Sequence, residues 1–515
     1  MASYAACLTA LHRVKPSRVV SDFALPALGC FLLASFVSGP DARADEAESL
    51  LDVDYVMYSD PEFVAPGSRI EVTNRPLELW LRELKKPNPV LQRQLADSIS
   101  LAGELSMPGI ERAIVPLVEL VSEKDLDPIL RRSIVKSLVS LGATEHAKLL
   151  AELSEREGRA IQSIVEPALI RWKDDVLREV WRDRITTPSS ADYYAMRLAI
   201  EGLGAIGDEA SSSKLRDIVE ANGASQPIRL AAASALSEIH DQGLVDFSQS
   251  LLASDPQSLG QRLLVVRLLR RHSDGDAMEV LFELAKGDQA SVKSPALDRL
   301  YELDPQRVVE IGREAIKHSD VNVRRIAALA FFARPSAGSI EPLSWLLDDP
   351  NPDLRRSAAD WLFQLAQGES LREEVIAQST RVLGSDDWRG CEQATRVLVS
   401  LDHQPCGDRL VELLTHPRGE AMVAAGWGLR RLALEQHLPA MFNRSLEIFD
   451  GFRQVQYTTD DNGPEDLQAQ LFLAFGQLKF RKAERLMRDY IPKDYSLGDD
   501  ARAAACWSLG RFHEG

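Results

Sequence analysis

Cysteine is scarce in this chain of 515 residues, which contains only five. Cys7 and Cys30 lie near the N-terminus, and Cys391, Cys406 and Cys506 lie toward the C-terminus. Cys7 and Cys30 lie in the predicted signal sequence described below, so three cysteines remain after its cleavage. Three is an odd number and gives no disulfide framework. Cys391 and Cys406 are expected near the starts of consecutive antiparallel helices, roughly 15 Å apart, whereas a disulfide needs Cα atoms within about 7 Å. We therefore predict free, packed thiols.

Aromatic residues and clustered positive charge are also in short supply. Aromatics make up 6% of the chain, while apolar residues together make up 45%. A chain rich in Ala and Leu and poor in aromatics favours helices over β-sandwiches. The formal net charge of −17 argues against general nucleic-acid binding, because neutralising phosphates requires gathered Lys and Arg. A local basic patch stays compatible with that charge.

Signatures of catalysis and of cofactor binding are missing from the sequence. It contains no Cys-x-x-Cys-His, His-Glu-x-x-His, P-loop or Gly-x-Ser-x-Gly motif. The nine histidines are scattered, and most of them, including His272, fall in predicted turns where solvation is expected. Carboxylates are plentiful, but none stand out as a general acid and base. We predict a protein that is not an enzyme and that uses no cofactor and no metal.

The first 44 residues have the features of a secretory signal. Three basic residues between positions 13 and 18 precede an apolar run over 23–37, and Ala42-Arg43-Ala44 matches a cleavage pattern. Cleavage between Ala44 and Asp45 would leave a mature chain with a net charge of −19 by the same counting, no integral membrane span, and a secreted or periplasmic location. The alternative is an uncleaved anchor, and it stays open.

A repeated unit organises the rest of the sequence. Asp320-Val321-Asn322-Val323-Arg324 opens one predicted helix, and Pro350-Asn351-Pro352-Asp353-Leu354-Arg355 opens the next. Pairs of alanines follow each opening, at 327–328 and 358–359, so that arginine and alanine both recur after 31 residues. A fixed period of this size is typical of a helical repeat solenoid. The acidic residues are expected at helix N-termini, and Arg324 and Arg355 are expected to tie one repeat to its neighbour.

The same pattern predicts thirteen first helices of helix pairs, many with two small residues at mid-helix, as at Ala232-Ala233 and Ala424-Ala425. We place them near Leu91–Ala102, Ile129–Leu141, Arg159–Trp172, Tyr193–Ile206, Pro227–Ile239, Leu259–Arg271, Val292–Leu303, Val323–Phe332, Leu354–Ala366, Cys391–Leu401, Glu420–Leu432, Asp466–Leu478 and Ala501–Phe512. Asp-x-x-Val/Leu-Arg followed by Ala-Ala resembles HEAT repeats, and in particular the short HEAT-like repeats of phycobilisome lyases and of bacterial scaffold proteins.

This resemblance covers about residues 76–515 and implies an all-α fold, an α-solenoid of about thirteen antiparallel helix pairs. It further implies a non-catalytic scaffold that binds another protein on a concave surface, which we expect the second helices to line. Two alternatives stay open: an accessory module of an enzyme or electron-transfer protein whose catalytic domain lies beyond Gly515, and an enzyme similar to the phycobilin lyases. The partner's identity and the oligomeric state do not follow from the sequence.

The pattern fails in three places where specific function is expected. Residues 45–75 form an acidic leader without helical period, residues 443–466 contain a polar loop insertion, and the small-residue face around Ala505 and Trp507 has no predicted partner, as at an uncapped end. Six residues are candidate contacts to a partner protein: Arg267, Arg270, Arg271, Trp427, Arg430 and Tyr457. The alternative interpretation is that these residues only stabilise the fold.

Overall fold

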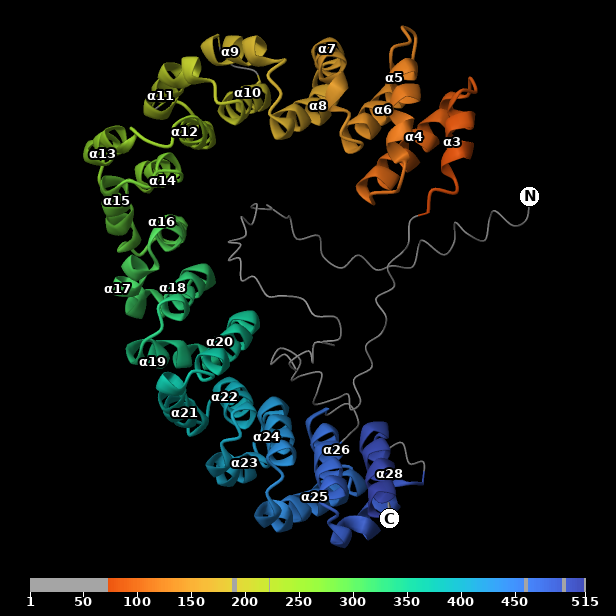
Figure 1. The fold of residues 1–515 in the computed structure, drawn as a ribbon, viewed down its shortest axis with the longest axis vertical. Helices are drawn as coiled ribbons and strands as arrows, with labels where there is room; N and C mark the ends of the chain where they lie inside the picture. Colours follow the sequence, from red (N-terminus) through yellow and green to blue (C-terminus); the bar gives the residue numbers. More distant parts are fainter. Residues whose placement is uncertain (1–72, 188–191, 222, 458–461, 493–496, 514–515) are drawn as a thin grey trace, which may run out of the picture. The chain divides into compact units, whose positions relative to one another are not determined.

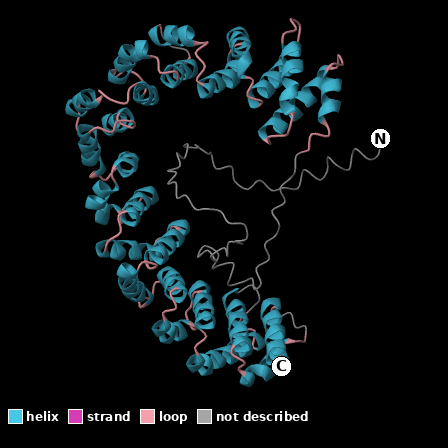
Figure 2. Ribbon diagram, viewed as in Figure 1, coloured by secondary structure: helices cyan, strands magenta, loops and turns pink. Residues whose placement is uncertain are grey.

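A computed structural model describes residues 73–187, 192–221, 223–457, 462–492 and 497–513. All regular structure within these ranges is helical, and they contain no strand (Figure 2). The predicted signal sequence, its cleavage site between Ala44 and Asp45, and nearly all of the leader lie outside them. The all-α expectation is confirmed for the residues that the structure describes.

Even-numbered helices form one layer of the array (Figure 1). They coincide with the thirteen predicted first helices: α4 (Pro89–Glu104), α6 (Pro128–Ser140), α8 (Arg159–Trp172), α10 (Tyr193–Ala205), α12 (Gln226–Ile239), α14 (Leu259–Leu268), α16 (Ala290–Leu303), α18 (Val321–Ala333), α20 (Pro352–Leu365), α22 (Trp388–Ser400), α24 (Gly419–Leu432), α26 (Asn462–Gln477) and α28 (Asp499–His513).

Odd-numbered helices form the other layer. They are α3 (Leu77–Leu84), α5 (Ile114–Val121), α7 (Ala147–Glu157), α9 (Arg178–Thr186), α11 (Ser212–Glu220), α13 (Val245–Ser254), α15 (Gly275–Ala285), α17 (Pro305–Ala315), α19 (Ala337–Trp345), α21 (Glu369–Leu383), α23 (Gly407–Leu413), α25 (Leu438–Arg453) and α27 (Glu484–Tyr490). Short 3-10 turns accompany several of them: η2 (Ile110–Ala113), η3 (Thr144–His146), η4 (Glu209–Ser211), η5 (Leu346–Asp348), η6 (Gln404–Cys406), η7 (Glu435–His437) and η8 (Arg481–Ala483).

The repeated aspartate and arginine of each unit have a structural explanation. Asp320 is the N-cap of α18, and its carboxylate accepts hydrogen bonds from the backbone N–H groups of Asn322 and Val323. Four residues later, Arg324 donates to the carbonyls of His318 and Ser319 in the preceding turn, at 2.9 and 2.7 Å. The motif therefore gives hydrogen-bond partners to backbone groups at both ends of the connection between an odd helix and the next even helix.

The arginine at this position also links neighbouring repeats. Arg324 makes two further hydrogen bonds, at 2.6 and 2.8 Å, to the carboxylate of Asp349 in the turn before α20. Both side chains are buried. Arg355 donates to the carbonyl of Asp349, and its guanidinium lies 5.7 Å from the ring centre of Trp388, the first residue of α22. These contacts confirm that both arginines connect repeats.

Small residues let the even-numbered helices approach closely. Both alanines of the pairs at 232–233, 327–328, 358–359 and 424–425 are fully buried. Consecutive even-numbered helices pack directly against each other throughout the array, whereas most consecutive odd-numbered helices make few contacts. The small residues therefore lie on the first helices of the pairs, where these helices pack on each other.

Two of the irregular regions differ from the expectation. The polar insertion within 443–466 is shorter than the pattern indicated, because α25 continues to Arg453 and buries Ile448, Phe449 and Phe452. Near the C-terminus, Ala505 is fully buried while Trp507 is 46% exposed. Ala505 therefore does have a packing partner, since α28 packs on α26 and α27.

Candidate functional site

Three consecutive even-numbered helices present a surface that is directed away from the odd-numbered layer. Each of these helices is flanked by even neighbours on two sides and by odd helices behind, so the remaining side faces solvent. Residues five, nine and twelve positions after an N-cap share that side of a helix. We define the even-helix face as these residues of α14, α16 and α18, all accessible to solvent: Leu263, Arg267, Arg270, Ser294, Asp298, Tyr301, Arg325, Leu329 and Phe332.

The predicted contacts Arg267 and Arg270 lie on this face and are exposed. Arg271 is not part of this face. Its guanidinium forms an ion pair at 3.0 Å with Glu238 of α12 and donates to the Glu238 carbonyl. Arg271 is thus mainly a link between two repeats. Desolvation by the surrounding helices, and to a smaller extent the charge of Arg270, lower the pKa of Arg267, although its side chain stays in contact with solvent.

Charge on the face is predominantly positive. Asp298 is its only carboxylate, and it shares its surroundings with Arg270 and Arg325. Desolvation and the nearby Glu302 raise the pKa of Asp298. Three arginines therefore outweigh one carboxylate. Sequence reasoning missed Arg325, although its position one residue after the repeated arginine was a usable signal.

Trp427 and Arg430 occupy the corresponding register positions on α24, nine and twelve residues after its N-cap Arg418. Both are buried, with 4% and 7% of their surface exposed. Every residue from Ala421 to Arg430 is buried, and α24 packs between α22 and α26. The structure therefore does not present these two residues as an exposed contact surface, contrary to the expectation.

Tyr457, the last predicted contact, packs against its own helix pair. Its ring meets that of Phe452 edge-on at 5.8 Å and occupies the space beside Gly451, where a Cβ would approach it to 2.4 Å. With His416 and Arg444 it also lines a cavity of about 480 Å³. The Tyr457 ring therefore packs against α25, at the start of the connection that leads to α26.

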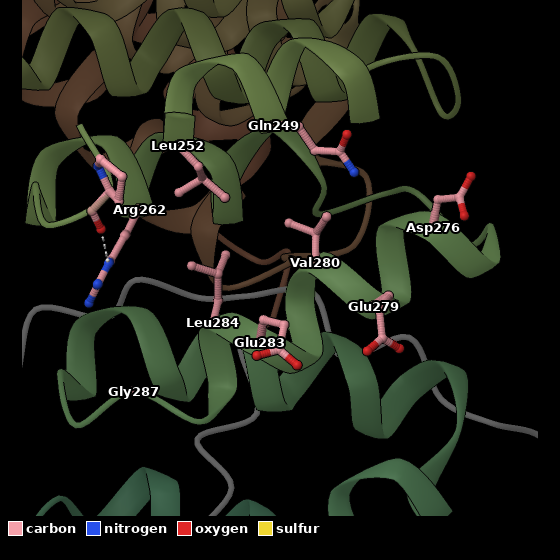
Figure 3. Close-up of a pocket in the computed structure, with 10 residues that line it drawn as sticks. Gln249, Leu252, Arg262, Asp276, Glu279, Val280, Glu283, Leu284 and Gly287 are labelled. Atoms are coloured by element: carbon pink, nitrogen blue, oxygen red, sulfur yellow. Dashed lines mark hydrogen bonds between the residues drawn. The ribbon is translucent and has the colours of Figure 1, made fainter. Parts of the chain in front are cut away.

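A second cavity, of about 550 Å³, lies in the odd-numbered layer between α13 and α15 (Figure 3). Leu252, Val280 and Leu284 supply its apolar wall. Carboxylates surround it, but Glu279 is paired with Arg307, and Glu283 is paired with Lys286. This cavity arises where neighbouring odd-numbered helices are loosely packed. The negative charges of Glu279 and Glu283 at its rim are neutralised by their cationic partners.

The titratable groups in the interior serve the fold. His272 is fully buried, and its Nε2 accepts a hydrogen bond from the backbone N–H of Leu244 at 3.1 Å, whereas a solvated turn histidine was expected. Burial lowers the pKa of His272. Cys391 and Cys406 are free and buried, as predicted, and burial raises the pKa of Cys406 to about 11.

Neither a metal site nor a membrane span was found among the described residues. Within the ranges that the structure describes, no three His, Cys, Asp or Glu residues are grouped so that they could hold an ion. In those same ranges, no helix combines the length and the apolar character that crossing a bilayer requires.

Comparisons with known proteins gave matches only among solved structures. No family model and no curated protein matches the chain. An engineered protein aligns over 85% of this chain and 99% of its own, with 14% identity and a TM-score of 0.25. A complex of Kap95p with RanGDP aligns over 84% of this chain, with 13% identity and a TM-score of 0.44, and a Kap95:Nup1 complex over 86%, with 14% and 0.38. The chain spans 60% and 63% of the length of these two matched chains.

Proposed function

We propose that this protein is a non-catalytic scaffold that binds another protein through the even-helix face. The observation that supports the proposal is the combination of exposed cations and apolar side chains on three packed helices. Arg267, Arg270 and Arg325 are exposed, and Leu263 and Leu329 are half-buried between them. Arginine is enriched at binding hot spots because its planar guanidinium combines apolar contact with several hydrogen-bond donors.

Rigidity of the array favours binding. The helices that carry the face are held by a continuous apolar core that extends from Leu77 to Phe512 and by buried links such as Arg324–Asp349. A preformed surface loses little conformational entropy when a partner binds. Phe332, at one end of the face, is also fixed, because its ring stacks on Trp361 at 5.9 Å. The expected partner is a protein with an acidic and apolar surface.

The location of this activity is part of the proposal. The basic, apolar and Ala-x-Ala segments at the N-terminus support export from the cytoplasm and cleavage after Ala44. Sequencing the N-terminus of the protein purified from its native source tests this step. A first residue of Asp45 is expected, and a first residue of Met1 would contradict cleavage.

Crosslinking in the native compartment tests the binding face. The tagged full-length chain, crosslinked and purified, is compared with the variant Arg267→Glu/Arg270→Glu/Arg325→Glu. Reversing these charges should remove a specifically captured protein, because like charges would then meet across the interface.

The matched control reverses three cations on odd-numbered helices, Lys148→Glu/Lys214→Glu/Arg485→Glu, whose side chains are accessible to solvent. This control should retain the captured protein. Equal capture by both variants would show that the even-helix face is not the binding surface.

A further inference from the structure

The even-helix face matches the chemistry of a segment of the same chain. Residues Leu50–Val64, with the sequence LLDVDYVMYSDPEFV, lie outside the described residues. They contain four carboxylates, at Asp52, Asp54, Asp60 and Glu62, and no Lys or Arg. Leucine, valine, tyrosine, methionine and phenylalanine make up most of the remainder. A segment that is both acidic and apolar complements a surface that is both basic and apolar.

The chain as a whole is acidic, with a net charge of −17. On the even-helix face, Arg267, Arg270 and Arg325 are exposed around the single carboxylate of Asp298. Leu263, Leu329 and Phe332 lie on the same face and keep part of their surface accessible. The arginines supply counter-charges for the four carboxylates, and the apolar side chains supply a surface for Tyr55, Tyr58 and Phe63.

The length of the intervening chain suits this placement. Val64 lies 13 positions before Leu77, the first residue of α3, and Leu50 lies 27 positions before it. Extended chain covers about 3.3 Å per residue, so the segment can reach from roughly 45 to roughly 90 Å from α3. Packed helices are about 9 Å apart, which puts α14 about 45 Å and α18 about 65 Å along the even-numbered layer from α4.

We propose that Leu50–Val64 is an intramolecular ligand of the even-helix face and competes there with the partner protein. The inference rests on the proposed function only for the competition, since occupancy of the face by the segment needs no partner. Tethering keeps the segment within reach of the face, but the linker must be almost fully extended, so its effective concentration is below that of a relaxed linker. A partner must therefore displace the segment, which selects for partners with a more complementary acidic surface.

Hydrogen exchange on the purified full chain, measured by mass spectrometry, tests the occupancy. At low salt, Leu50–Val64 should exchange at least about tenfold more slowly than a synthetic peptide of the same sequence, which corresponds to a segment bound in about nine of ten molecules. The variant Arg267→Glu/Arg270→Glu/Arg325→Glu should bring the exchange to the peptide rate. High salt should do the same, because it screens surface charges.

Two further variants separate loss of docking from damage to the array. Asp52→Asn/Asp54→Asn/Asp60→Asn/Glu62→Gln leaves every helix unchanged and should also release the segment. Arg132→Glu/Lys136→Glu reverses exposed cations at the same register positions of α6 and should leave the protection intact.

Three outcomes would overturn the proposal. They are exchange of the segment at the peptide rate in the wild-type chain, protection that persists in both the arginine and the leader variants, and protection that falls on dilution, which would assign the segment to a second copy. None of them depends on a partner. Failure to capture a partner would therefore contradict the proposed function but not the docking of the segment. Lack of protection of the segment would contradict its docking but not the proposed function.

Discussion

At the residue scale, the guanidinium of Arg324 has four hydrogen bonds in a buried setting. Two go to the Asp349 carboxylate and two to backbone carbonyls. Arg324→Ala would leave Asp349, 4% exposed, without its cation. Breaking a buried ion pair in this way costs about 3–5 kcal/mol, because the remaining charge stays buried. We expect a clear fall in the midpoint of urea unfolding.

The neighbouring residue provides the control for this substitution. Arg325 is exposed and bonds only to the side chain of Asn322 in its own helix. Arg325→Ala should change the free energy of unfolding by no more than about 0.5 kcal/mol. Equal midpoints for the two variants would show that the Arg324–Asp349 link does not stabilise the array.

A second prediction at this scale concerns acidification. His272 is buried and accepts a hydrogen bond through Nε2, so the folded state disfavours its protonation and its pKa lies below the ordinary 6.5. The unfolded chain takes up the proton at pH 6.5, so protons favour unfolding below that pH. Stability contributed by His272 is therefore complete above pH 6.5 and is lost as the pH falls further.

Thermal unfolding measured between pH 7.5 and 5 tests this sign. His272→Gln keeps an acceptor for the Leu244 N–H but does not titrate. The variant should lose less stability on acidification than the wild type, even if it is less stable at pH 7.5. Parallel pH profiles for the two proteins would mean that His272 does not carry the effect.

At the element scale, the helix assignment could be made from the sequence because helix formation depends on local signals. Capping residues before the helices, alanine pairs and an apolar period recur in many units. Asp320 and Asn351 with the alanine pairs that follow place α18 and α20 correctly. The role of His272 could not be predicted, since its burial depends on contacts with a turn 28 residues earlier. The same holds for Trp427 and Arg430, whose register position matches that of exposed residues on α14.

Close approach of α10 and α12 gives a prediction for these two elements. A Cβ on Gly204 would lie 2.8 Å from the Cα of Ala235, which is backbone and cannot rotate away. Gly204→Ala should force the helices apart and cost about 1–3 kcal/mol. Gly510→Ala is the control, because nothing lies within 4 Å of that position and alanine favours a helix.

Only the Gly204 variant should therefore have a lower unfolding midpoint. The Gly204 variant should melt at a lower temperature than the wild type, and the Gly510 variant at the same or a higher one. A Gly204→Ala protein as stable as the wild type would show that α10 and α12 can separate at no cost.

At the scale of the whole molecule, most contacts among the described residues join elements that are close together along the chain. Helix α20 packs against α18, α19, η5, α21 and α22 and makes no comparable contact with distant repeats among the described residues. Stability of such an array is a sum of local terms and nearest-neighbour interfaces. Damage to one repeat should accordingly stay local.

Ala358→Glu tests this locality, because Ala358 is fully buried in α20 and the substitution forces a charge into a contact between helices. Amide exchange should become faster in α18–α22 and stay unchanged in α4–α8. Gln364→Glu, at an exposed position of the same helix, should alter neither region. Faster exchange throughout the array would show that it unfolds as one cooperative unit, so that binding at the even-helix face would stabilise every repeat. A strictly local response would instead confine the effect of any ligand on that face to the repeats around α14–α18.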